Sequence, residues 1–241
     1  MEAQSSQPAR EDFRGRLAAI ERAVADGTYR PGPWRELVRD IRNSMFFERA
    51  AAAEDVSRVS RALHLRKRRR MVSMNTGILL EVAATMIGGL LLVAGVALRS
   101  NAVSFLGAIV WMVTFEPLIK LMIGRLAGVQ YDYLYLWGVE PRLKMRYGTY
   151  LARPRWLRIV VHLSGTVGSP LAAWLASWML SDTMPPASAL CYAAFWILVA
   201  INVVNFAAPM FGVYRIGPLP VSMSSAGSAA LEIQEGLGWR S

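Results

Sequence analysis

The chain has 241 residues, of which 54% are hydrophobic, and its mean hydropathy is +0.30. A soluble domain of this length needs less apolar material, so the composition excludes an ordinary soluble domain. The net charge of +10 would suit a nucleic-acid-binding protein. Lysine and arginine instead gather beside the apolar runs, where the positive-inside rule places them, so we expect no nucleic-acid partner.

Four apolar runs are each long enough to cross a hydrocarbon core about 30 Å thick, which takes about 20 helical residues. They cover residues 75–98, 102–123, 157–180 and 187–211. We therefore predict an α-helical integral membrane protein with a four-span domain over 75–213 and the lipid bilayer as a partner. The first run is too long and too late to be a secretory signal, so we expect it to be kept as an anchor.

The charges around the runs predict the orientation. Residues 1–70 hold 16 Lys and Arg against 10 Asp and Glu, and residues 124–158 hold 7 against 2. The two short connections, 99–101 and 181–186, hold one Arg and one Asp. The positive-inside rule then places both termini and the middle loop in the cytoplasm and the protein in the cytoplasmic (inner) membrane.

Residues 1–70 are predicted to form a cytoplasmic helical pair. Apolar residues recur at helical spacing in 11–25, and a second stripe runs from Trp34 to Leu63 beyond a turn at 29–33. The basic run 66–70 precedes the first span and suits an anchor against anionic lipid. The single cysteine, Cys191, falls inside the fourth run and is expected to be a buried structural thiol.

Polar residues interrupt the first two runs. Glu81 lies in the first, together with Gly88 and Gly89, and a carboxylate inside a membrane needs a partner or access to water. The second run ends in Glu116-Pro117-Leu118-Ile119-Lys120, and the spacing of Glu116 and Lys120 puts them on one helix face. The glycines favour close helix packing.

In the middle loop the spacing of the apolar residues changes from helical to alternating. Alternating residues over 129–150, broken near Gly138 and Pro141, predict a β-hairpin at the cytoplasmic face. An aromatic belt would explain the composition of this loop but not its period of two. The tail 214–241, rich in Gly, Ser and Pro, is predicted to be flexible, with a short helix over 228–235.

The third and fourth runs add His162, Asn202 and Asn205. Counted at 1.5 Å per residue from the predicted cytoplasmic ends, Glu81, Glu116, His162 and Asn205 fall about 6 to 10 Å into the membrane. A helix-breaking stretch, 164–170, follows His162 and implies close packing or a distorted helix. The common depth predicts one polar site shared by all four spans.

The order of these features resembles the site-2 protease family of intramembrane zinc proteases. That family has a His-Glu-x-x-His helix that continues to Arg-x-x-Gly-[Ile/Val], and 125–129 here read Arg-Leu-Ala-Gly-Val at the same offset. Residues 162–171 resemble a divergent form of the family's Ala-Gly-Pro-x-x-Asn segment. Residues 202–209 resemble the start of its Asn-x-x-Pro…Asp-Gly segment. The resemblance covers about 102–213 and implies the membrane core of an intramembrane protease, with a strand hairpin between its second and third spans.

The departures from the family pattern concern its zinc site. Glu116, Pro117 and Lys120 stand where the family has His, Glu and His, and no Asp lies between Pro209 and Gly212. Proline cannot act as a base, and a lysine ammonium cannot bind a metal ion. We therefore expect no cofactor, with zinc disfavoured, and no metalloprotease activity.

Three hypotheses remain open. The first is a catalytically inactive relative of the family in which Lys120 occupies the place of the lost cation, held by Glu116, with Glu81 or His162 completing a neutral cluster. Such a protein would bind a membrane segment or partner protein, with strand addition to the hairpin edge as one mode. The second is an enzyme or transporter that uses Glu81, Glu116 and His162 as a rearranged metal or proton site. The third is a structural assembly subunit whose polar layer only specifies helix packing.

Overall fold

The structure is a computed structural model that describes residues 7–44, 46–66, 70–137, 140–216 and 219–237. Four helices among these residues are long and apolar enough to cross a membrane: α4 (Met74–Ala97), α5 (Asn101–Leu126), α7 (Arg155–Leu180) and α8 (Pro185–Met210). Every bound lies within three residues of its predicted position. The prediction of four long apolar helices is confirmed, and it supports a multi-pass membrane protein.

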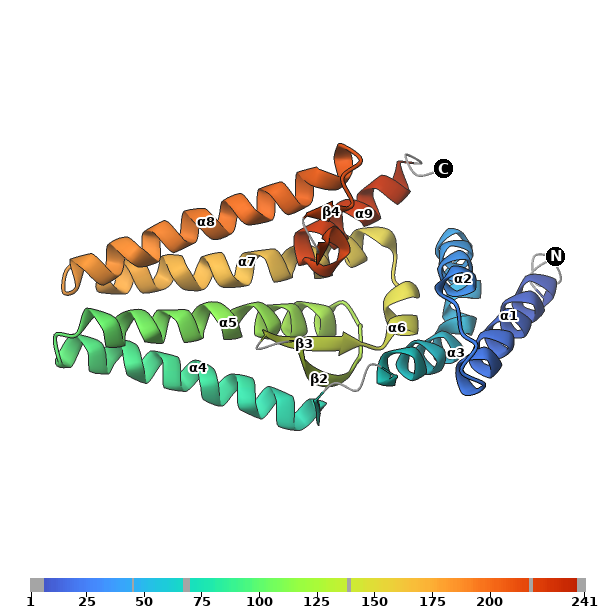
Figure 1. Ribbon diagram of the computed structural model, residues 1–241, viewed down its shortest axis with the longest axis horizontal. Coiled ribbons are helices and arrows are strands. Elements are labelled where there is room, and N and C mark those ends of the chain that lie inside the picture. Colours follow the sequence, from blue (N-terminus) through green and yellow to red (C-terminus); the bar gives the residue numbers. More distant parts are fainter. Residues whose placement is uncertain (1–6, 45, 67–69, 138–139, 217–218, 238–241) are drawn as a thin grey trace.

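The four helices lie side by side along the long axis of the molecule (Figure 1). Their outward surfaces are apolar: Leu90 on α4 is 66% exposed, and Trp178 on α7 is 67% exposed. Such an apolar surface is favourable in the hydrocarbon core of a membrane and unfavourable in water. Cys191 is fully buried on α8, as predicted for a structural thiol.

Small residues let α4 and α5 pack closely, as the glycines of the first run predicted. A Cβ added to Gly95 would lie 2.5 Å from the backbone nitrogen of Ser104, and one added to Gly107 would lie 2.7 Å from the carbonyl oxygen of Gly88. Neither gap admits a methyl group. The Thr85 hydroxyl also donates to Thr114 Oγ1 at 2.9 Å across the same contact.

The sheet follows α5 in the chain and contains the predicted hairpin. Strands β2 (Tyr131–Trp137) and β3 (Glu140–Met145) pair antiparallel, with Leu134 opposite Leu143. A third strand, β1 (Met71–Ser73), pairs with β2 on its other side, giving the order β1-β2-β3. We did not predict β1, because it directly precedes α4. The predicted break at Gly138 and most of the basic run 66–70 lie outside the described residues.

The second half of the predicted hairpin is wrong beyond Met145. Helix α6 (Tyr147–Leu151) stands where the alternation of 143–150 predicted a strand. Tyr150 and Leu151 are buried, and the Gly148 N–H donates to Ser57 Oγ at 3.0 Å. Packing against α3 therefore outweighs the local pattern, as tertiary contacts often do.

The predicted N-terminal helical pair is three helices: α1 (Gln7–Ala25), α2 (Pro31–Asn43) and α3 (Phe46–Leu65). The single stripe from Trp34 to Leu63 is divided at Ser44, whose backbone is extended and whose hydroxyl donates to Ile41 O at 2.8 Å. No proline or glycine lies at this break, and the helical spacing of the apolar residues continues across it. The sequence pattern therefore gave no sign that the helix ends at residue 43. The three helices share a core that includes Leu17, Ile41 and Val59.

The prediction of a flexible tail is wrong for residues 219–237, whereas the short helix predicted over 228–235 falls inside a longer helix. Short strands β4 (Arg215–Ile216) and β5 (Leu219–Pro220) and the 3-10 turn η1 (Val221–Met223) lead into α9 (Ser225–Gly236). Ser224 caps α9 by accepting from the Gly227 N–H at 3.0 Å. Ala226, Ala229 and Ala230 are buried as α9 packs on α7 and α8. The small residues that suggested disorder are the ones that let this helix approach closely.

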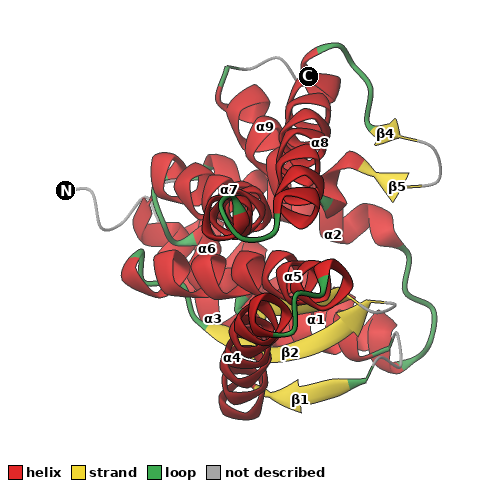
Figure 2. Cartoon of the chain, turned by 90° about the vertical axis from the view of Figure 1, so that its left-hand side faces the viewer, coloured by secondary structure: helices red, strands yellow, loops and turns green. Residues whose placement is uncertain are grey.

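The sheet, α6, α9 and the N-terminal helices all lie at one end of the four-helix bundle (Figure 1). Viewed along the bundle, α9 lies beside α7 and α8, and β2 runs across the side of α4 and α5 (Figure 2). This arrangement separates an apolar bundle from a more polar end, at which the candidate site lies.

Candidate functional site

A short chain of hydrogen bonds joins α5 to α9. Lys120 Nζ donates to Ser225 Oγ at 3.0 Å, and the Ser225 hydroxyl donates to Glu116 Oε1 at 3.0 Å. Glu116 and Lys120 share a helix face, as their spacing predicted. Sequence reasoning missed Ser225, which comes from the tail that we predicted to be flexible. We call these three residues the polar bridge.

Glycines on α7 make room for the polar bridge. A Cβ added to Gly168 would lie 2.6 Å from the backbone nitrogen of Glu116, and one added to Gly165 would lie 3.0 Å from Ser225 Cβ. The close packing predicted for 164–170 is confirmed at both positions. On the other side of α5, the Tyr131 hydroxyl donates to the Lys120 carbonyl at 2.9 Å. The backbone around the bridge is therefore held from two sides.

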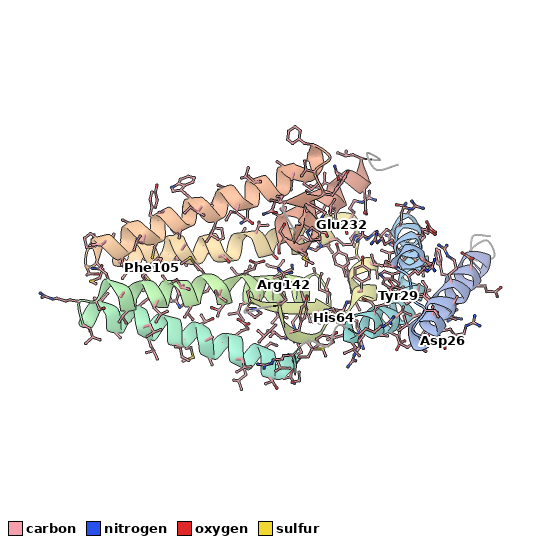
Figure 3. All side chains as sticks on the ribbon, viewed as in Figure 1. Asp26, Tyr29, His64, Phe105, Arg142 and Glu232 are labelled. Carbon is pink, nitrogen blue, oxygen red and sulfur yellow. The ribbon has the colours of Figure 1, made fainter. Side chains whose placement is uncertain are left out.

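The polar bridge lies in the wall of a cavity of about 600 Å³. Its walls come from α3, α5, α7, α8, β2, β3 and the segment that starts α9. Representative lining residues are Lys120, Arg142, His162, Leu198 and Ser222. Figure 3 shows Arg142 on β3 and His64 toward the N-terminal helices, at the same end of the bundle as Glu232. The volume of the cavity falls in the range of ligand pockets, about 300–1,000 Å³.

His162 connects this cavity to a buried network. Its Nε2 lies 2.8 Å from the Tyr150 hydroxyl, which itself donates to Glu232 Oε1 at 2.5 Å. A phenol has one proton, so the Tyr150 oxygen accepts from Nε2, and Nε2 carries the ring proton. Nδ1 of His162 is then an acceptor, buried and without a hydrogen-bond partner in the part of the chain that the structure describes.

Glu232 is the centre of the charge network. It is 2% exposed and lies 3.2 Å from Arg158 Nη2 and 3.4 Å from Arg42 Nη2. Arg42 also pairs with Glu235 at 2.7 Å. Burial raises the pKa of Tyr150 well above its ordinary value, and the Glu232 carboxylate raises it further, so Tyr150 stays a donor at neutral pH.

Sequence reasoning missed Arg42, Tyr150, Arg158 and Glu232. They come from α2, α6, α7 and α9, and no local spacing connects them. The one available signal was in the tail, where Ala226, Ala229, Ala230 and Ile233 repeat at helical spacing. The short helix predicted over 228–235 contains Glu232, but no spacing in the sequence connects it to Arg42, Tyr150 or Arg158.

Of the predicted polar layer, the structure brings Glu116, Lys120 and His162 to one cavity and leaves three members elsewhere. Glu81 is 7% exposed on α4 and does not line the cavity; its Oε2 has no hydrogen-bond partner within the described ranges. Asn205 donates to Ile201 O at 2.9 Å on its own helix. The prediction of one site shared by all four spans is therefore wrong for Glu81 and Asn205.

Asn202 belongs to a different place. It donates to Thr166 O at 2.9 Å, which ties α8 to α7. It also lines an apolar groove of about 560 Å³ between these helices, together with Leu163, Trp174 and Phe206. An apolar groove between two long apolar helices is suited to hydrocarbon and offers no chemistry of its own.

The donor groups at the cavity do not fit a zinc ion. Within the described residues, no group of three His, Cys, Asp or Glu could hold a metal ion. The Lys120 ammonium donates a hydrogen bond to Ser225 and has no lone pair for a metal ion, and Glu116 Oε1 accepts from the Ser225 hydroxyl. The cavity lining holds one carboxylate, Glu116, and two imidazoles, His64 and His162, and these do not form such a group. Catalytic zinc sites use three protein ligands held around one ion.

No family model, curated protein or solved structure matches this chain. The resemblance to the site-2 protease family therefore stays a hypothesis that rests on the order of the sequence features.

Proposed function

We propose that this chain is a multi-pass membrane protein that binds a membrane segment or a partner protein in the cavity beside β3 and carries out no zinc-dependent hydrolysis. In this proposal its core is a catalytically inactive relative of the site-2 protease family, seated in the cytoplasmic membrane with both termini in the cytoplasm. The bound segment would lie along β3.

The observation that carries the proposal is the position of β3. It is the last strand in the order β1-β2-β3, and Arg142, Leu143 and Met145 on it line the cavity. An extended segment can add to such a strand through main-chain hydrogen bonds. Pro141 on β3 suits an outer strand, because proline cannot donate to a ladder. The walls from α5 and α8 would contact apolar side chains of the same segment.

The polar bridge supports a binding role over a catalytic one. Glu116 and Lys120 both bond Ser225, so their charges are engaged in holding α9 against α5. A catalytic acid or base must reach a substrate proton. A neutral, hydrogen-bonded cluster instead lowers the cost of placing two charges inside the bundle.

A photocrosslinking experiment tests the binding. Benzoylphenylalanine at Leu143 should form an adduct in native membranes, and mass spectrometry should map the other end to an apolar segment of a membrane protein. The same probe at Leu90, which is 66% exposed on α4, is the control and should react with lipid. Equal lipid labelling at both positions would contradict the proposal and favour a structural subunit.

Metal analysis tests the proposal that the chain carries out no zinc-dependent hydrolysis. We expect the purified chain and its Glu116→Ala and His162→Ala variants to carry the same substoichiometric zinc. Stoichiometric zinc that disappears in either variant would overturn the inactive core and favour a rearranged metal site.

A further inference from the structure

An excess of arginine gathers where α2, α3, α7 and α9 meet. Arg42 and Arg158 pair with Glu232 and Glu235. Arg49 on α3 and Arg155 on α7 have no ion pair with a carboxylate among the described residues. Among the side chains that the structure describes here, four guanidiniums stand against two carboxylates, an excess of two positive charges.

The arginines lie close enough to repel each other. Burial lowers the pKa of Arg49, and the charges of Arg158 and Arg155 lower it further. A Cβ added to Gly236 would lie 3.1 Å from Arg155 Nη1, so Arg155 also lies against the end of α9. Like charges held together in this way indicate a place that an anion would stabilise.

Several of their donor groups are buried without a partner. Arg158 is 1% exposed, and its Nε and Nη1 have no hydrogen-bond partner in the described part of the chain; the same holds for Nε of Arg49 and of Arg155. Arg49 Nη1 does donate, at 2.8 Å, to Ser44 O. Buried donors normally have partners, so unpaired ones on three neighbouring arginines need an explanation.

The helix terminus at this place is uncapped. Arg155 is the first residue of α7, and the preceding residue, Pro154, makes no side-chain hydrogen bond to the first turn. The first amide groups of a helix point out of its end and carry partial positive charge. The N-terminus of α7 therefore adds to the field of the arginines.

We propose that Arg49, Arg155 and Arg158, with the N-terminus of α7, bind the phosphate group of an anionic ligand. Guanidinium groups match phosphate geometry, and helix N-termini favour the same anion. This site is separate from the cavity beside β3, and it does not depend on the proposed function.

The position fits two sources of phosphate. If α7 spans a membrane, its first residue lies at the interface, where phospholipid headgroups are. Trp156, the next residue, is 63% exposed, as interfacial anchors are. Free phosphate in solution offers the same group, so the experiment has one arm for each source.

The test uses the full chain purified in detergent. One arm titrates phosphatidylglycerol against phosphatidylcholine, followed by native mass spectrometry. The other titrates inorganic phosphate against chloride at equal ionic strength, followed by the midpoint of thermal unfolding. Arg49→Gln and Arg155→Gln should each weaken binding about fivefold, as expected for one charge near a membrane surface. Arg125→Gln, an exposed arginine at the end of α5, is the matched control and should bind as wild type does.

The arms separate the outcomes. Losses in the first arm assign the site to a lipid headgroup, and losses in the second assign it to free phosphate; either result supports the site. Arg155→Lys keeps the charge and should retain most of the affinity, so a folding defect cannot imitate the loss. If both Gln variants match Arg125→Gln with both ligands, the proposal is wrong.

Discussion

The Tyr150 hydroxyl lies 2.5 Å from Glu232 Oε1, and this contact joins the short helix α6 to the C-terminal helix α9 across 82 residues of chain. Both side chains are almost fully buried. The same hydroxyl accepts from His162, so one phenol oxygen joins three helices. A carboxylate buried at this depth is stable only while its partners remain.

Removing the hydroxyl should therefore destabilise the fold. Tyr150→Phe leaves His162 Nε2 without its acceptor and Glu232 without one donor, and we expect a loss of about 1–3 kcal/mol of unfolding free energy. Thermal or denaturant unfolding in detergent measures it. Tyr192→Phe is the control, because Tyr192 is 51% exposed on α8, and it should change little. Equal losses in the two variants would show that the Tyr150 contact contributes nothing.

The Arg42–Glu235 pair should hold the N-terminal helices to α9. Arg42 Nη1 donates to both carboxylate oxygens of Glu235, at 2.7 and 2.8 Å, and both side chains are about four-fifths buried. A double-mutant cycle with alanine at each position should give a coupling of about 1.5–3 kcal/mol.

An exposed pair supplies the comparison for that cycle. Arg58 and Glu21 lie 2.8 Å apart, but their side chains are 55% and 38% exposed. Solvent screens such a pair, so its coupling should be about 0.2–1 kcal/mol. If the two cycles give the same value, burial does not strengthen the Arg42 pair.

The spans were predictable because each one alone carries its signal: an apolar run of sufficient length needs no other part of the chain to identify it. The same-face placement of Glu116 and Lys120 followed from helical spacing in the same way. What could not be predicted depends on contacts between distant segments. The polar bridge needs Ser225, 105 residues after Lys120. The network around Glu232 draws on four helices, and α6 is helical because it packs on α3. The small residues of the C-terminal tail suggest disorder when α7 and α8, the helices on which they pack, are not known to be their neighbours.

Close packing of α7 on α5 should be sensitive to one methyl group. Gly168→Ala places a Cβ 2.6 Å from the Glu116 backbone nitrogen, which cannot move without its helix, so we expect a loss of about 1–3 kcal/mol. Gly89→Ala is the control, because its Cβ would meet Trp111 at an ordinary 3.5 Å. Alanine there should be neutral or slightly stabilising. Thermal unfolding of both variants in one detergent decides the question.

The polar bridge should behave as one electrostatic unit. Lys120→Met leaves the Glu116 carboxylate without a neighbouring ammonium, and Glu116→Gln leaves the Lys120 ammonium without its carboxylate; each should lower stability, because an uncompensated charge inside the bundle is costly. The double variant removes both charges and keeps the Ser225 hydroxyl between two uncharged side chains. It should lose less unfolding free energy than the two single variants together, by about 1–3 kcal/mol. Ser228→Ala removes a hydroxyl of the same helix that donates to Ser222 O and not to the bridge, so it controls for general loosening of α9. If the losses of the single variants simply add, the two charges act independently, and the role assigned to the bridge in the proposed inactive core loses its basis.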